Sequence, residues 1–265
     1  MSVRIGPVER LAPVIAMVAC VVLVVALCAG GWRLVMLVAS VPWQPVAGRV
    51  SWTEVLVGTG FTALRVFGTL VLGTAWALPA GLAIGRSPRG ARLLQPLVQV
   101  AASFPAPMLF PLLLLVFQLV GLPLGIGAMV LMLMGTQWYI LFNVIAGAQA
   151  IPSDLKEAAA SFRLNPWRRF WTLEAPAVLP ALLTGWVTAA GGAWNASIVA
   201  EYLTWHEVVH ATDGLGATIS RATAAGDYRG LAAAVAVMAV VVVAINHVLW
   251  HPLQRFARQR FALDK

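Results

Sequence analysis

The sequence predicts an all-α, polytopic membrane protein, and three observations support this class. Apolar residues make up 60 % of the 265 residues and charged residues only 11 %, about half the charged share of an ordinary globular domain. The mean hydropathy is +0.85. The apolar residues also run continuously instead of alternating, as membrane-spanning helices require and barrel strands do not. A soluble enzyme, a disordered chain and a disulfide scaffold are therefore excluded.

Charge-free runs predict six membrane-spanning helices at about 20 residues per crossing. These runs cover residues 11–32, 66–85, 93–153, 175–200 and 230–254. The run 93–153 is long enough for a hairpin of two helices, which we expect to turn at residues 120–127, where Gly and Pro cluster. Residues 1–30 continue too far as an apolar run for a cleaved signal, so we expect an uncleaved first helix.

The net charge of +8 is explained by membrane topology. With the N-terminus in the cytoplasm, 13 of the 18 basic residues fall on inner segments, whereas the ten acidic residues divide equally between the two sides. This is the distribution that the positive-inside rule favours. The basic character therefore indicates a lipid bilayer as the partner, and no nucleic acid is needed to explain it.

Residues 151–180 contain the strongest local pattern. Ser153 after Pro152 fits an N-cap, and an apolar stripe follows at helical spacing, formed by Leu155, Ala158, Ala159 and Phe162. Asn165 and Pro166 then predict the N-cap and first residue of a second short helix. The pattern indicates a helix–turn–helix elbow on the cytoplasmic face, which either docks into a partner or lies on lipid.

The elbow resembles the EAA loop of permease subunits from binding-protein-dependent ABC importers. The matching residues are Glu157-Ala158-Ala159 and, ending nineteen positions after Glu157, Leu173-Glu174-Ala175-Pro176. Arg163 stands where the family has a glycine that permits the turn, and Leu173 and Ala175 replace the family Ile and Leu. Further motifs in the family's order lie at residues 78–87, 103–111, 191–202 and 211–227, and the last two are similar to the nitrate/sulfonate/taurine branch.

The resemblance implies a type I importer core with cytoplasmic coupling helices. It implies three protein partners, namely a cytoplasmic ABC ATPase dimer, a second permease subunit that is identical or homologous, and an extracytoplasmic solute-binding protein. The solute would be a small anion such as nitrate, a sulfonate or taurine. The sequence contains no P-loop motif, so we expect no enzymatic activity and no cofactor in this chain, with ATP-Mg bound by the partner. The expected location is the bacterial inner membrane, with both termini cytoplasmic.

Three segments and two sets of site residues follow from this interpretation. Residues 1–50 would form an N-terminal helix and outer connection, 51–252 the permease core with a coupling loop at 151–176, and 253–265 a basic cytoplasmic tail. The coupling set is Glu157, Ala158, Ala159, Phe162, Arg163, Asn165, Pro166, Arg168 and Pro176. Polar residues at membrane depth are candidates for the translocation path, namely Gln99, Ser103, Gln137, Asn143, Thr188 and Asn195, although a hydrogen bond between helices is the more common role of a single polar residue in a bundle.

Two other functions are compatible with parts of the sequence. His206-Glu207-x-x-His210 fits the HExxH pattern of a zinc hydrolase if it lies on a helix, but no third ligand is evident. A stand-alone secondary transporter would show inverted repeats and intramembrane charge, and neither is clear here. Arg65 precedes the second apolar run, where it could attract an anion or extend to lipid headgroups. Gly81 and Gly85 predict close helix packing.

Overall fold

The computed structural model describes residues 29, 33, 50–205 and 207–261. The chain divides into two units, Met1–Ala47 and Gly48–Lys265, and the following description concerns the second. Apart from residue 29, the expected first span, residues 11–32, lies outside the described residues, and so does nearly all of the expected N-terminal segment.

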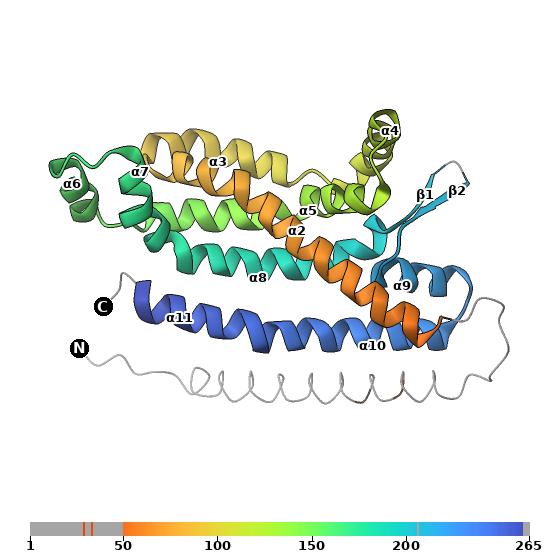
Figure 1. Cartoon of the computed structure of the whole chain (residues 1–265). Helices are drawn as coiled ribbons and strands as arrows, with labels where there is room; N and C mark the ends of the chain where they lie inside the picture. Colours follow the sequence, from red (N-terminus) through yellow and green to blue (C-terminus); the bar gives the residue numbers. More distant parts are fainter. Residues whose placement is uncertain (1–28, 30–32, 34–49, 206, 262–265) are drawn as a thin grey trace, which may run out of the picture. The chain divides into compact units, whose positions relative to one another are not determined.

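Three long helices form the centre of this unit, and α5 packs against both of the others (Figure 1). They are α2 (Trp52–Gly85), α5 (Leu124–Gln149) and α8 (Ala175–Ala200). Glycines allow the close approach of α2 to α5, because a Cβ built on Gly85 would lie 2.6 Å from the Cβ of Ala148. A Cβ on Gly81 would likewise lie 2.6 Å from Val144. The structure therefore confirms the packing role predicted for these two glycines.

The remaining helices surround this centre. The segment between α2 and α5 consists of α3 (Pro88–Ala102), the 3₁₀ turn η1 (Ala106–Leu109) and α4 (Phe110–Val120). Helix α9 (Leu215–Ala224) contacts α2 and α8. The last long helix comprises α10 (Tyr228–Ile245), the π-helical turn η3 (Asn246–Trp250) and α11 (His251–Phe261). The expected basic tail from residue 253 is therefore helical as far as Phe261.

The described part of the chain contains four helices that are long and apolar enough to cross a membrane, or five if one bent pair counts as a span. The bent pair is the first arm of the predicted hairpin, because the chain turns by 70° between Pro88–Ala102 and Ala106–Val120. Pro105 and Pro107 lie at this bend and cannot donate backbone hydrogen bonds. The hairpin turn itself is confirmed, since α4 ends at Gly121 with φ 68° and α5 begins at Leu124.

Helix α2 begins much earlier than the charge-free run predicted. Ser51 caps it by accepting a hydrogen bond from the Glu54 amide, while the Glu54 carboxylate accepts one from the Ser51 amide. This capping box starts the helix at Trp52, so Arg65 lies within α2 rather than ahead of it. A charge-free run marks the segment that suits lipid, but a helix can extend beyond it.

A two-stranded antiparallel hairpin departs from the all-α prediction. Strands β1 (Tyr202–Trp205) and β2 (Val208–Ala211) pair after α8 and project from the end opposite α6 and α7 (Figure 1). Glu207 occupies the turn with φ 65° and His210 lies in β2. The helix that zinc binding by the HExxH pattern needs is absent, so that alternative is wrong. Residue 206 is not described, and the described side chains contain no cluster of three or more potential metal ligands.

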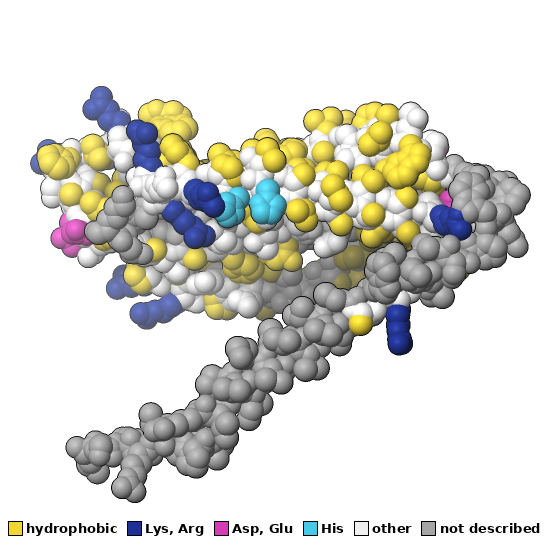
Figure 2. All heavy atoms as spheres, turned by 90° about the horizontal axis from the view of Figure 1, so that it is seen from below, with side chains coloured by type: hydrophobic (Ala, Val, Ile, Leu, Met, Phe, Trp, Pro, Cys, Tyr) yellow, Lys and Arg dark blue, Asp and Glu magenta, His cyan; other side chains and the backbone are white. Residues whose placement is uncertain are grey.

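The surface agrees with a bilayer setting. Large apolar side chains are exposed along the long helices, for example Leu64 at 70 % and Val71 at 69 % on α2. Figure 2 shows hydrophobic side chains over the middle of one face and Lys and Arg gathered mainly toward one end. Exposed apolar area of this extent favours lipid or protein contact.

Candidate functional site: the elbow and the polar stripe

The elbow comprises α6 (Ser153–Ser161), α7 (Pro166–Arg169) and the π-helical turn η2 (Phe170–Glu174), which continues directly into α8. Asn165 caps α7 as predicted, because its side chain accepts a hydrogen bond from the Arg168 amide at 2.8 Å. The prediction for Ser153 is wrong by one residue. Pro152 holds the N-cap position and α6 has no side-chain cap.

Arg163 turns the chain between the two short helices. Its φ of 48° is left-handed, a conformation that glycine adopts freely and other residues rarely do. This is the position at which the sequence departs from the family glycine. The turn is therefore retained with an arginine in it, while Asn165 and Pro166 start the next helix.

The predicted apolar stripe is left mostly uncovered. Ala159 is buried, whereas Phe162 is 79 % exposed and Leu155 37 % exposed. Two tryptophans that the sequence analysis did not single out add to this surface, because Trp167 is 70 % and Trp171 57 % exposed. Their rings meet edge to face with centroids 5.7 Å apart. Exposed aromatic residues of this kind are typical of protein interfaces. The presence of several aromatic residues in one short segment is the sequence feature that could have indicated this surface.

The other predicted coupling residues lie on the same elbow. Glu157, Ala158, Pro166 and Arg168 are exposed, and Pro176 lies in the first turn of α8. The coupling set thus occupies one continuous segment of backbone with several side chains free to meet a partner.

Glu174 joins the elbow to α2, a contact that the sequence did not reveal. Its carboxylate is 1 % exposed and accepts two hydrogen bonds from Arg86, at 2.9 Å from Nε and 2.6 Å from Nη2. Arg169 approaches the same carboxylate, with Nε 2.9 Å from Oε1. We call Arg86, Arg169 and Glu174 the elbow cluster. A bidentate arginine–carboxylate contact fixes orientation as well as distance.

A polar stripe runs along α8. Thr184, Thr188 and Asn195 are all exposed and share one helical face by their spacing. The two threonine hydroxyls donate to carbonyls of their own helix. The side-chain amide of Asn195 has no hydrogen bond to the other described residues, although an amide at membrane depth needs a partner.

Residues of helix α5 lie next to α8 beside this stripe. A Cβ on Gly192 would lie 3.1 Å from the Tyr139 ring, and one on Gly185 would lie 3.2 Å from the Cβ of Asn143. Asn143 is half-buried and donates to the Tyr139 carbonyl at 2.8 Å. Thr188 and Asn195 therefore share one face of α8, and Asn143 lies on α5 where that helix packs against Gly185 of α8.

The other path candidates lie elsewhere. Gln137 is buried in α5 at 9 % exposure. Gln99 lies on α3, and Ser103 ends that helix with its hydroxyl donating to the Gln99 carbonyl at 2.8 Å. Gln99 and Ser103 therefore belong to the bent pair of helices α3 and α4 rather than to the stripe.

The prediction for Arg65 is wrong in both its forms, because the side chain is held inside the protein. Its Nη1 lies 2.8 Å from Oε1 of Glu201, a carboxylate that is fully buried at the end of α8. The Thr62 hydroxyl donates to the same carboxylate at 2.8 Å. Arg65 also donates to the Asp213 carbonyl at 2.6 Å and the Gly125 carbonyl at 3.0 Å. We call Thr62, Arg65 and Glu201 the hairpin-end cluster.

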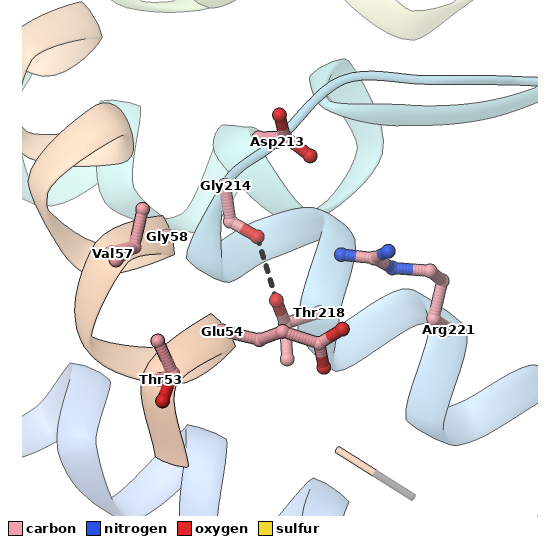
Figure 3. A pocket seen from close by; sticks show the side chains of 8 residues that line it. All are labelled: Thr53, Glu54, Val57, Gly58, Asp213, Gly214, Thr218 and Arg221. Carbon is pink, nitrogen blue, oxygen red and sulfur yellow. Dashed lines mark hydrogen bonds between the residues drawn. The ribbon is translucent and has the colours of Figure 1, made fainter. Parts of the chain in front are cut away.

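The first turn of α9 completes this cluster. The Gly216 amide donates to Glu201 at 3.0 Å, as suits a carboxylate at a helix N-terminus. Gly214 leaves the space, because a Cβ there would overlap the Glu201 carboxylate. On its other side Gly214 borders a pocket of about 190 Å³ between α2 and α9, where Glu54 and Arg221 also lie (Figure 3).

The described unit is thus a bundle of apolar helices with an exposed aromatic elbow at one end and a polar stripe on α8, an arrangement that suits a component of a membrane transport system. The chain belongs to the family of binding-protein-dependent transport system inner membrane components, which matches residues 73–250. This confirms the resemblance carried by the motifs.

Two relatives and one solved structure illustrate the similarity. The chain is 24 % identical over 135 residues to the glycine betaine/proline betaine permease ProW of Escherichia coli, covering 51 % of this chain and 36 % of ProW. It is 26 % identical to the taurine permease TauC of the same species, covering 68 % of this chain and 60 % of TauC. It thus spans between a third and two thirds of the length of these relatives. The MetNI methionine ABC transporter shares the fold with a TM-score of 0.63 at 18 % identity, covering 78 % of this chain and 97 % of that one.

Proposed function

We propose that this chain is the permease subunit of an ATP-driven importer in the bacterial inner membrane. It would pair with a second permease subunit, bind a cytoplasmic ATPase dimer through the elbow and receive solute from an external binding protein. The observation that carries the proposal is the elbow itself, with its exposed aromatic side chains and its buried anchor at Glu174. The lack of a P-loop in the sequence supports ATP hydrolysis in a separate subunit.

The stripe on α8 supports a path for a small polar solute. The side chain of Asn195 is exposed without a hydrogen bond to the other described residues, so it would face water or the second subunit rather than lipid. The relatives named for nitrate and bicarbonate support a small anion as the solute. The relatives named for taurine and glycine betaine keep a zwitterion as the second candidate.

Co-purification tests the proposal. The tagged chain is isolated from its native membranes in mild detergent, and associated proteins are identified by mass spectrometry. A stoichiometric P-loop ATPase is expected. Glu157→Lys should remove the ATPase while leaving membrane insertion intact, because it places positive charge in the exposed docking helix. Glu207→Lys, at an exposed residue in the turn of the β-hairpin at the other end of the unit, is the matched control. An unaccompanied wild-type chain would contradict the proposal.

Labelling tests the path. Asn195→Cys, in a chain with Cys20 and Cys28 replaced by Ser, should react with a water-soluble thiol reagent in assembled complexes. Val71→Cys is the comparison, because Val71 is exposed on an apolar part of α2 and should remain unlabelled in lipid. Equal protection of both cysteines would place Asn195 outside the path.

A further inference from the structure

The elbow cluster and the hairpin-end cluster, each built on a buried carboxylate, repeat one arrangement at opposite ends of the same helix pair. In each, an arginine of α2 meets a glutamate at one end of α8. Arg86 pairs with Glu174 just before α8 begins, and Arg65 pairs with Glu201 just after α8 ends. Both carboxylates are almost fully buried, with side-chain exposures of 1 % and 0 %.

The spacing of the two arginines matches the thickness of a membrane. Arg65 and Arg86 are 21 positions apart on α2 and its C-cap, or about 31 Å at 1.5 Å per residue. A bilayer has a hydrocarbon core of about 30 Å. The 20 residues between them, 66–85, carry no charge. The clusters therefore fasten α2 to α8 at the two faces of the membrane, where charged groups are tolerated.

Each cluster also holds a part that lies outside the helix pair. The elbow cluster includes Arg169 from the end of α7. The hairpin-end cluster binds the first turn of α9 through Gly216, and the segment after β2 through the carbonyl of Asp213. A helix pair that is fixed at both ends thus joins the docking elbow to the β-hairpin.

We propose that Arg86 and Glu174 are positioning residues for transport. Their ion pair joins α2 and α8 into one rigid unit, which we call the strut, and the strut transmits movement of the elbow to the hairpin end. The proposal rests on the function proposed above. Backbone connects the elbow to α8 directly, and the Arg86–Glu174 ion pair adds the link to α2. Rigid packed elements transmit displacement in this way, and bidentate geometry resists shear between them.

A cysteine at the hairpin reports on the strut. Val208 is 56 % exposed on β2, and Val208→Cys is introduced into full-length chain lacking Cys20 and Cys28. The complex with its co-purified ATPase is labelled with a maleimide, first without nucleotide and then trapped with ATP and vanadate. The parent should show a severalfold change in labelling rate on trapping. Arg86→Gln should abolish this change while the ATPase remains bound and continues to hydrolyse ATP.

The controls separate positioning from folding. Arg89→Gln removes an equivalent charge three positions further along the chain, at an exposed position of α3, and should respond as the parent does. Arg86→Lys keeps the charge but loses the bidentate contact and should restore part of the response. If Arg86→Gln lowers yield and ATP hydrolysis but the assembled fraction responds as the parent does, the role is structural only and the proposal fails.

Two further outcomes would overturn the proposal. A parent whose Val208→Cys labelling does not change on trapping would show that the hairpin end does not move with the elbow. A parent that purifies without any ATPase would refute the function proposed above, and the strut with it. The first result leaves the permease function standing and the second does not, so the two failures are distinguishable.

Discussion

Gly214 shows how one missing side chain positions a charged group. A Cβ at this residue would overlap the carboxylate of Glu201. Gly214→Ala should therefore displace the carboxylate from Arg65 and Thr62, and we expect a loss of about 1–3 kcal/mol, the usual cost of overpacking. Thermal unfolding of the purified protein in detergent measures it.

Gly60 provides the control for this substitution. It lies on α2 with no atom within 4 Å of a built Cβ, so Gly60→Ala should be neutral or stabilise by up to about 1 kcal/mol through helix propensity. Equal effects of the two substitutions would mean that Gly214 does not depend on its contact with Glu201.

Arg163 is a second residue whose backbone determines the outcome of substitution. Its φ of 48° costs a non-glycine residue about 1–2 kcal/mol. We expect Arg163→Gly to be more stable than Arg163→Ala by up to about 1 kcal/mol, since both remove the side chain and only glycine relieves the strain. Ala160→Gly, in the regular helix α6, should instead destabilise by about 1 kcal/mol. Melting temperatures of the three variants check the order, and an alanine variant at least as stable as the glycine variant would contradict it.

At the scale of elements, the sequence predicted those features that depend on local chemistry. The cap at Asn165, the turn after α4 and the glycine contacts of α2 follow from a few neighbouring residues, and the structure confirms them. The early start of α2 and the β-hairpin were missed. Arg65 was taken to mark a span boundary because its partner, Glu201, is 136 positions away, and no local pattern announces such a pair.

The hairpin was missed for a different reason. The HExxH spacing was weighed as a helical motif, but the segment is rich in Thr, Val, Tyr and Trp, which favour strands. The π-helical turn that carries Glu174 also lacks a sequence signal. Contacts between residues that are far apart in the sequence determine such features. The sequence analysis therefore missed the elbow cluster, although its three residues lie in or next to recognised motifs.

The elbow yields a prediction about docking. If its aromatic surface binds a protein, Phe162→Ala should weaken association with the ATPase roughly tenfold to a hundredfold, since burying a Phe side chain is worth about 1.5–3 kcal/mol. The melting temperature of the chain should not change, because Phe162 is already 79 % exposed. Quantitative co-purification over a range of dilutions measures the affinity. Leu119→Ala, at an equally exposed residue of α4, is the control. Unchanged ATPase retention would favour lipid contact at the elbow.

At the scale of the whole molecule, the charge distribution and the fold give the same membrane axis. The elbow lies at one end of α2, α5 and α8, and the β-hairpin lies at the other (Figure 1). The basic residues of α3, α6, α7 and α11 share the elbow end by chain connectivity, which is the asymmetry that the positive-inside rule requires. The two ion-pair clusters then fall at the two membrane faces, where the cost of burying charge is smallest.

This axis predicts which residues are accessible from each side. In cells expressing a chain without native cysteines, Val208→Cys should react with a membrane-impermeant maleimide added outside, because β2 would lie on the outer face. Asp154→Cys, at an exposed residue of α6, should react only after the membrane is permeabilised, because the elbow would lie inside. Both positions are solvent-exposed in the structure, so a difference between them reports the side of the membrane and not burial within the protein. Permeabilised cells, in which both cysteines must react, control for reactivity. Labelling of Asp154→Cys in intact cells would mean that the topology is the reverse of the one predicted. The elbow would then lie outside the cell, beyond the reach of any cytoplasmic ATPase.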